Sequence, residues 1–223
     1  MKFQAIMFMC NDFERAFFTL HTFRRHHPDI KIRVVNSGGE DPTSRLKYLN
    51  VEVVQAPNLW HKKTLCGVGS FGPEFADYLF DYGLNEEFTH TLMFETDVLT
   101  NRRVTVEPKY DISGPTNPCG HNELKLYDYL NINENKIHTG CGGTMFSLNY
   151  FKKIKENNYD FFVNLFNKFP QHYFMDMILT LAARVNGLSF GHWEEVSNVP
   201  VHVVNGKMVN VNYSATLVHN FKI

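Results

Sequence analysis

The sequence predicts an α/β fold in which helices flank a mostly parallel central sheet within one domain of 223 residues. In the first hundred residues, short apolar runs alternate with stretches whose apolar residues recur at helical spacing, a pattern typical of strands joined by crossover helices. The chain also has enough apolar material for a full core, since 43% of its residues are hydrophobic and 20 are phenylalanine. A chain of this length is expected to form one compact unit.

Charge, hydropathy and cysteine content exclude several classes of protein. Lys and Arg number 22 against 23 Asp and Glu, so the chain lacks the cationic excess that binding to a nucleic-acid backbone needs. No apolar run approaches the roughly 18–20 residues of a membrane span, and we expect none. The cysteines are too few and scattered to staple such a domain, which predicts free thiols in a reducing cytoplasm. They are Cys10, Cys66, Cys119 and Cys141.

Strands and helices alternate through the first half of the chain. The continuous apolar run from Phe3 to Met9 predicts a strand that is buried on both faces. Asn11 and Asp12 follow as a turn and candidate N-cap of a helix that Pro28 ends. Strands are then expected over 30–35, 51–55 and 91–94, and a helix over 72–82. Polar clusters at 10–12, 36–41 and 95–97 follow three of these strands, where parallel sheets bind ligands.

The second half is less regular. Residues 107–145 are rich in Pro, Gly and Asn, which predicts long loops. Helices are expected over 149–168, where an aromatic stripe recurs, and over 174–186, where Asn186-Gly187 ends the pattern. Near the C-terminus, the apolar runs 201–204 and 208–211 flank Asn205-Gly206, which predicts a hairpin with a tight turn.

Glu95 and Asp97 form the most informative motif, because they follow a buried strand at the edge where ligands are expected. Carboxylates at positions i and i+2 of an extended segment lie on the same side, so both can face one hard cation, which prefers oxygen ligands. Acid-x-acid triplets also occur by chance, and two ordinary loop acids are the alternative interpretation. The position after the strand favours a site for a cation that bridges to phosphate oxygens.

Together these features resemble the GT-A glycosyltransferases, which use nucleotide sugars. The resemblance extends over most of the chain and includes the N-terminal strand-helix-strand, Glu95-Thr96-Asp97, a Gly-Gly loop and an acid on a late helix. It implies one GT-A (Rossmann-like) domain, with a nucleotide-binding half over 1–105 and an acceptor-side half over 106–223. It also implies that Glu95 and Asp97 bind Mn²⁺ (or Mg²⁺) against the donor diphosphate, although the family more often has Asp at the first position.

The resemblance places the donor nucleotide at the ends of the first two strands. Asn36, Ser37 and Asp41 belong to a small polar loop, which lets backbone groups approach a planar base and offers acceptors for ribose hydroxyls. A plain Gly-Gly turn is the alternative. The other residues expected to contact the nucleotide sugar are Met9, Cys10 and Asn11 on the facing wall, Thr96, and Lys62 and Lys222 near the diphosphate. Lys62 can equally be a solvated surface residue.

The glycine-rich segment 138–146 resembles the family loop that passes under donor and acceptor. Gly142 and Gly143 would let the backbone lie against a sugar, and a plain turn into a strand is the alternative. A different interpretation joins four zinc-compatible side chains from this region. They are Cys119, His121, His138 and Cys141. The single residue between Cys119 and His121 is a tight spacing for a zinc site, so we rank this below the sugar loop.

Asp176 stands among apolar residues at the start of the late helix. In GT-A enzymes an acid there lies beside the acceptor, and in inverting members it removes the hydroxyl proton, so the resemblance makes Asp176 the candidate general base. A structural role at the positive end of the helix dipole is the alternative. His219 matches a late histidine that completes the metal shell in many family members.

The resemblance thus implies a metal-dependent glycosyltransferase that moves a sugar, from what we expect to be a UDP-sugar, to a hydroxyl of a glycan or glycoprotein. The compact size is similar to that of glycosyltransferase domains with which large DNA viruses glycosylate capsid protein, which would place the chain in a host cytoplasm. A sugar nucleotidyltransferase is the second interpretation, although the chain lacks a Gly-rich basic loop after the first strand. A non-catalytic, zinc-stabilised binding domain is the third.

Overall fold

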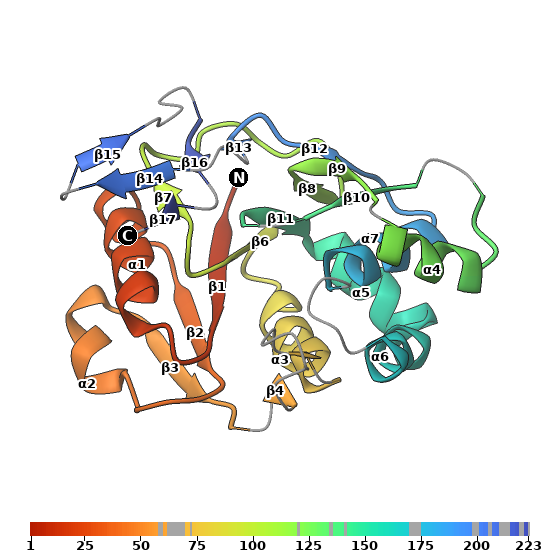
Figure 1. The fold of residues 1–223 in the computed structure, drawn as a ribbon, viewed down its shortest axis with the longest axis horizontal. Helices are drawn as coiled ribbons and strands as arrows, with labels where there is room; N and C mark the ends of the chain where they lie inside the picture. The colour runs from red at the N-terminus through yellow and green to blue at the C-terminus, as the bar shows by residue number, and fades with distance from the viewer. Residues whose placement is uncertain are drawn as a thin grey trace.

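The computed structural model describes residues 1–57, 60–61, 70–71, 73–119, 121–133, 136–140, 142–169, 175–197, 201–204, 207–209, 215–218 and 221–222. Its largest element is a seven-stranded sheet with the order β12–β8–β11–β6–β1–β2–β3 (Figure 1). In chain order these strands are β1 (Phe3–Met9), β2 (Ile32–Asn36), β3 (Glu52–Gln55), β6 (His90–Phe94), β8 (Ile112–Gly114), β11 (Thr144–Ser147) and β12 (Phe190–His192). Strand β11 runs antiparallel to its two neighbours, and the other pairs are parallel.

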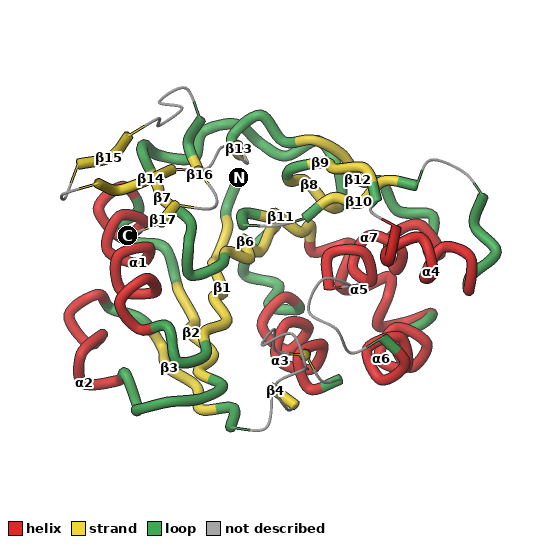
Figure 2. Tube along the Cα trace, in the orientation of Figure 1, coloured by secondary structure: helices red, strands yellow, loops and turns green. Residues whose placement is uncertain are grey.

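Helices cover both faces of this sheet (Figure 2). They are α1 (Phe13–His26), α2 (Thr43–Leu46), the short 3-10 helix η1 (Lys47–Leu49), α3 (Glu74–Gly83), α4 (His121–Tyr129), α5 (Leu148–Asn157), α6 (Tyr159–Lys168) and α7 (Met175–Val185). Small sheets complete the described part. Their strands are β4 (Trp60–His61), β5 (Ser70–Phe71), β7 (Leu99–Thr100), β9 (Thr116–Pro118), β10 (Ile137–Thr139), β13 (Val196–Ser197), β14 (Val201–Val204), β15 (Lys207–Val209), β16 (Leu217–Val218) and β17 (Phe221–Lys222).

The apolar residues of β1 divide between two cores, as the continuous apolar run predicts. Ala5 and Met7 are fully buried in the core that α1 covers. Ile6 is fully buried in the core on the other face, which contains side chains of α3, α5, α6 and α7. Successive side chains of a strand point to opposite faces, so an unbroken apolar run belongs in the centre of a sheet with helices on both sides.

The predicted loops over 107–145 are wrong, because this segment contains β8, β9, α4, β10 and β11. Three of these strands are only three residues long, and such short strands cannot display an alternating pattern. The predicted helix over 149–168 is in fact two helices, α5 and α6, which break at Asn158 with φ −143°. Asn158 donates from Nδ2 to Asn186 Oδ1 at 2.8 Å, so a contact distant in sequence accompanies the break.

The C-terminal hairpin is confirmed: β14 and β15 pair antiparallel, with Val204 opposite Lys207. Its turn residues, Asn205 and Gly206, lie outside the described residues. The second strand of the hairpin begins at Lys207, one residue before the predicted start. Strand β14 also pairs with β17 in parallel, which adds a third strand to the hairpin.

His27 supplies a test of the packing beneath α1. The ring is 1% exposed, stacks on Phe23, and accepts a hydrogen bond at Nε2 from the Val104 N–H at 3.2 Å. Burial, and then the positive charge of Arg103, lower the pKa of His27 from 6.5 to about 4. Between those pH values the unfolded chain binds the proton and the folded chain does not, so stability falls as the pH falls.

We expect this titration to cost about 2 kcal/mol of unfolding free energy between pH 8 and pH 5. The neutral variant His27→Gln should lose that part of the pH dependence, because its side chain does not titrate. Urea unfolding at the two pH values measures the difference. His21→Gln, at an exposed histidine of α1, is the control. Identical pH dependence in the wild type and in His27→Gln would contradict the assignment.

Candidate functional site

The strand register brings the three predicted polar clusters to one edge of the sheet. Met9 is opposite Asn36 in the β1–β2 pair, and Met7 is opposite Phe94 in the β1–β6 pair. Because these strands are parallel, the segments that follow β1, β2 and β6 all leave the sheet at its carboxyl edge. The segments 10–12, 37–41 and 95–97 therefore lie at the same end of the fold, as the sequence predicts.

The loops after β1 and β2 pack tightly against each other. Ser37 donates to the Met9 carbonyl oxygen from its backbone N (2.9 Å) and from Oγ (2.8 Å). Gly39 has φ +82°, and a Cβ placed there would lie 2.4 Å from Asn11 Oδ1. A side chain at position 39 would thus be strained by its backbone and would collide with Asn11. The half-buried Cys10 also borders this loop, with Sγ 3.1 Å from a Cβ placed on Gly38.

A chain of amide and carboxylate groups holds the second loop in shape. Asn36 donates from Nδ2 to Gln55 Oε1 at 2.9 Å, and Gln55 donates from Nε2 to Asp41 Oδ1 at 2.7 Å. Hydrogen bonds from the hydroxyl and the N–H of Thr43 lower the pKa of Asp41. Asn36, Ser37 and Asp41 thus have hydrogen bonds that shape the loop, whatever ligand contacts they also make.

A cavity of about 190 Å³ opens between these loops. Its walls include Met9, Asn11, Gly38, Asp41 and two residues that sequence reasoning missed, Phe13 and Arg45. The Arg45 guanidinium lies 3.5 Å from the centroid of the Phe13 ring and bonds to Glu14 Oε1 at 2.8 Å. An aromatic ring under a planar cation is a flat surface suited to stacking. No local sequence pattern pairs position 13 with position 45.

The Glu95–Asp97 turn is attached to helix α1. Thr96 donates from Oγ1 to Asp12 Oδ2 at 2.8 Å, and Thr19 donates from Oγ1 to the Thr96 carbonyl oxygen at 2.6 Å. Asp12 is the N-cap residue of α1, as the sequence predicts, but its side chain makes no capping hydrogen bond. Its carboxylate instead accepts from the turn that carries the acids. Glu95 and Asp97 are half-buried, and Oδ1 of Asp97 is fully buried.

Asp176 lies against the glycine-rich loop. A Cβ placed on Gly140 would lie 2.5 Å from Cγ of Asp176, so only glycine allows the loop to pass so close to this half-buried carboxylate. Thr180 joins the helix to β10, because its Oγ1 donates to the Thr139 carbonyl oxygen at 3.0 Å and accepts from the Thr139 N–H at 2.9 Å. The acid and the loop predicted to serve the acceptor are therefore neighbours.

The other two glycines of this loop have distinct surroundings. Gly142 has φ +70°, a backbone conformation that favours glycine. A Cβ on Gly143 would lie 3.2 Å from Leu217 Cδ1 in β16. Strand β16 also pairs antiparallel with β7, with Val218 opposite Leu99. One strand near the C-terminus thus contacts both the glycine-rich loop and the strand that follows Asp97.

Several predicted site residues lie wholly or partly outside the described residues. Lys62 and His219 lie outside the described residues, and only the backbone of Lys222, in β17, is described. Of the zinc interpretation, Cys119 Sγ lies 3.8 Å from His138 Nδ1, whereas Cys141 and the His121 side chain are not described. Within the described residues, no three His, Cys, Asp or Glu side chains gather in a group that could hold a metal ion.

No protein-family model and no curated protein matches this chain. Among solved structures it is similar to the bifunctional glycosyltransferase WbbM in its apo form, with a TM-score of 0.57 and 11% identity over 98% of this chain and 45% of that one. It is also similar to the glycosyltransferase GlyE of Streptococcus pneumoniae TIGR4, with a TM-score of 0.49 and 13% identity over 87% of this chain and 46% of that one. The chain thus spans less than half of either structure. The likeness to WbbM confirms the predicted fold class.

None of the helices in the described ranges is both long and apolar enough to cross a membrane.

The packing of Gly39 against Asn11 can be tested by a double-mutant cycle. Gly39→Ala should lower the unfolding free energy by about 1 kcal/mol for its positive φ and by a further 1–3 kcal/mol for the collision with Oδ1. Asn11→Gly removes the colliding atom, so in that background only the backbone part should remain. Gly187→Ala, which has φ +64° and open space around it, is the control for backbone strain. Urea unfolding measures each value, and a cost unchanged in the Asn11→Gly background would contradict the packing.

Proposed function

We propose that the protein is a glycosyltransferase that moves a sugar from a nucleotide-diphosphate donor to an acceptor hydroxyl. The observation that carries the proposal is the position of Glu95 and Asp97 at the same sheet edge as the cavity between the β1 and β2 loops. A nucleotide in that cavity would direct its diphosphate along the edge toward the two acids. The similarity of the fold to a glycosyltransferase structure supports the same reaction class.

The carboxylate oxygens of Glu95 and Asp97 suit a hard divalent cation. Mg²⁺ and Mn²⁺ prefer oxygen ligands, and Mg²⁺ usually binds one or two carboxylates together with substrate phosphates. Glu95 and Asp97 would supply the carboxylates, and we propose His219 as a further ligand. The bound cation would compensate the negative charge that develops on the leaving diphosphate. Lys62 and Lys222 are proposed to contact the same diphosphate.

The remaining residues would bind and orient the two substrates. Met9, Asn11 and the flat surface of Phe13 and Arg45 line the cavity that we propose for the base and ribose. Gly142 and Gly143 would let donor sugar and acceptor approach the backbone. Asp176 would remove the proton of the acceptor hydroxyl. The oxygen of that hydroxyl would attack the anomeric carbon of the donor sugar, while the bond between this carbon and the diphosphate breaks. This step describes an inverting reaction.

The finer assignments extend the same proposal. We propose a UDP-sugar as donor, a glycan or glycoprotein as acceptor, and a cytoplasmic setting. The compact size of the chain supports the further proposal of a viral enzyme whose acceptor is a capsid protein. The contact between Cys119 and His138 favours one competing proposal, the zinc-stabilised binding domain. Elemental analysis of purified protein separates the two, since that domain would hold one zinc per chain and bind no nucleotide sugar.

Asp97→Asn should abolish donor binding that depends on a divalent cation. The amide is neutral, so the charge of the diphosphate would be poorly compensated. Calorimetric titration with uridine diphosphate, in Mn²⁺, in Mg²⁺ and in chelator, measures the effect. Asp29→Asn, an exposed aspartate after α1, is the control and should bind like the wild type. Equal affinity of the wild type in all three conditions would refute the cation site.

Asp176→Asn should slow transfer by roughly 100-fold or more while donor binding stays nearly intact, because only the base is lost. Asp160→Asn is a matched control, since Asp160 also lies in the first turn of a helix. Loss of a favourable interaction with the helix dipole would cost either variant about 0.3–1 kcal/mol of stability. Transfer rates and thermal unfolding should be measured for both. Wild-type rates in Asp176→Asn would exclude the base role.

A further inference from the structure

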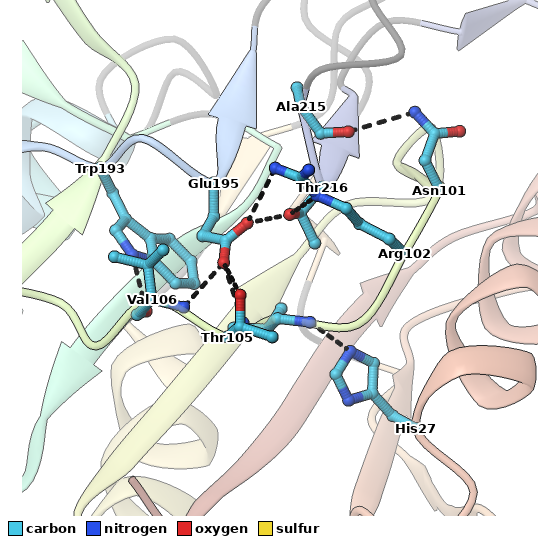
Figure 3. Close-up of polar contacts among 10 residues, drawn as sticks. His27, Asn101, Arg102, Thr105, Val106, Trp193, Glu195, Ala215 and Thr216 are labelled. Atoms are coloured by element: carbon cyan, nitrogen blue, oxygen red, sulfur yellow. Dashed lines mark hydrogen bonds and ion pairs between the residues drawn. The ribbon is translucent and has the colours of Figure 1, made fainter.

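A carboxylate that no step of the proposed reaction uses is buried at the centre of a polar cluster (Figure 3). Glu195, in the turn before β13, is only 1% exposed. Burying an ionised carboxylate is costly unless hydrogen bonds replace its water. Glu195 therefore needs donors from the surrounding chain, and two segments that lie far apart in sequence supply them.

The first segment is the loop over 101–106, which follows β7. Oε1 of Glu195 accepts hydrogen bonds from the backbone N–H groups of Thr105 (2.8 Å) and Val106 (2.7 Å), and from Thr105 Oγ1 at 3.2 Å. Trp193 adds a hydrogen bond from Nε1 to the Val106 carbonyl oxygen at 3.2 Å. These bonds attach the loop to the turn that contains Glu195.

The second segment is the start of β16. Oε2 of Glu195 accepts a hydrogen bond from Thr216 Oγ1, and the Glu195 carbonyl oxygen accepts one from the Leu217 N–H at 2.8 Å. Thr216 Oγ1 in turn accepts from Nε of Arg102 at 2.9 Å. The Arg102 guanidinium lies 3.8 Å from Oε2 of the same carboxylate (Figure 3). One carboxylate thus bonds to both segments, with a cation beside it.

Both segments converge on β7, which begins two residues after Asp97. Thr100 is opposite Leu217 in the β7–β16 pair, and the Asn101 N–H donates to the Thr216 carbonyl oxygen at 2.9 Å. β7, β13 and β16 contain two residues each, so few backbone hydrogen bonds hold this sheet together. The side-chain bonds of Glu195 therefore make up a large share of the connection. The side chain of Leu217 in β16 also approaches Gly143 of the glycine-rich loop.

We infer that Glu195 is a positioning residue for the donor site: by bonding the 101–106 loop to β16, it fixes β7 and the Glu95–Asp97 turn relative to the glycine-rich loop. This rests on the proposed function, because the site that it positions is the proposed site for cation and diphosphate. Glu195 contacts no reacting atom and acts through β7. Loosening its bonds should raise the donor and cation concentrations needed for half-saturation and leave kcat at saturation nearly unchanged.

If Glu195 had a purely structural role, its loss would lower stability without changing these concentrations. The test therefore needs, as a control, another carboxylate that stabilises the fold away from the donor site. Asp111 is suitable, because it also joins several segments. It accepts hydrogen bonds from Ser147 Oγ (2.8 Å), Asn149 Nδ2 (3.0 Å) and the Ser189 N–H (3.0 Å). Asp111 precedes β8, which runs parallel to β6, so it lies at the amino edge, away from Asp97. Asp111→Asn should weaken the fold and spare the donor site.

The decisive variant is Thr216→Val, which keeps the shape of the side chain and removes the hydroxyl that bonds to Oε2. Uridine diphosphate is titrated calorimetrically at a fixed Mn²⁺ concentration, and thermal unfolding is measured in parallel. We expect the Kd of Thr216→Val to rise about 10-fold, which corresponds to a coupling of about 1.4 kcal/mol between this bond and donor binding. Glu195→Ala should lose more, and Glu195→Gln, which keeps an acceptor for Thr105 and Val106, should recover part of the loss. Asp111→Asn should stay within about twofold of the wild type.

Each result decides between the interpretations. Wild-type affinity in Thr216→Val would overturn the inference, even if Glu195→Ala fails to fold. An equal loss of affinity in Asp111→Asn would also overturn it, since general destabilisation would then explain both variants. A wild-type protein that binds no nucleoside diphosphate in Mn²⁺ would refute the proposed function itself. That failure is visible before any variant is made, so the two outcomes are distinguishable.

Discussion

The burial of β1 on both faces is the constraint on which the rest of the fold depends. Met7 packs into the core beneath α1, and Ile6 packs into the core beneath α3 and α5–α7. Both edges of the strand are paired as well, with β2 on one side and β6 on the other. A slip of one residue would exchange the side chains of the two cores, so the register is strongly specified. That register sets which residues reach the carboxyl edge.

The candidate site depends on this edge, and many of its polar groups are engaged in shaping it. Ser37 bonds to Met9, Thr96 to Asp12, and Thr180 to Thr139. The first two bonds hold loops in place, and the third joins α7 to β10 next to the glycine-rich loop, so each limits how far a loop of the site can move. The site thus has two kinds of residue. Some hold the loops, and others carry the proposed chemistry: Glu95 and Asp97 as cation ligands, and Asp176 as the base.

A strand near the C-terminus, β16, contacts the candidate site. β16 pairs with β7, next to the Glu95–Asp97 turn, and its Leu217 lies close to Gly143. The proposed donor side and the proposed acceptor side therefore share one short strand, which Glu195 connects to the 101–106 loop. A strand as short as β16 has few backbone hydrogen bonds, so side-chain bonds are needed to fix its position. This need explains the buried carboxylate of Glu195, whose burial is otherwise costly.

By itself, the sequence determined β1, β2, β3, β6, α1 and α3, and the position of Glu95 and Asp97 after β6. Their signals are local, since a two-sided strand or an amphipathic helix shows its period within about ten residues. Only the tertiary structure decided the elements within 107–145, the stacking of Arg45 on Phe13, the bond from Thr96 to Asp12 and the surroundings of Glu195. Each depends on residues that are distant in sequence, and a three-residue strand or a lone buried acid has no periodicity to reveal its partner. The roles of the site residues remain predictions, because a similar fold does not assign chemistry to individual side chains.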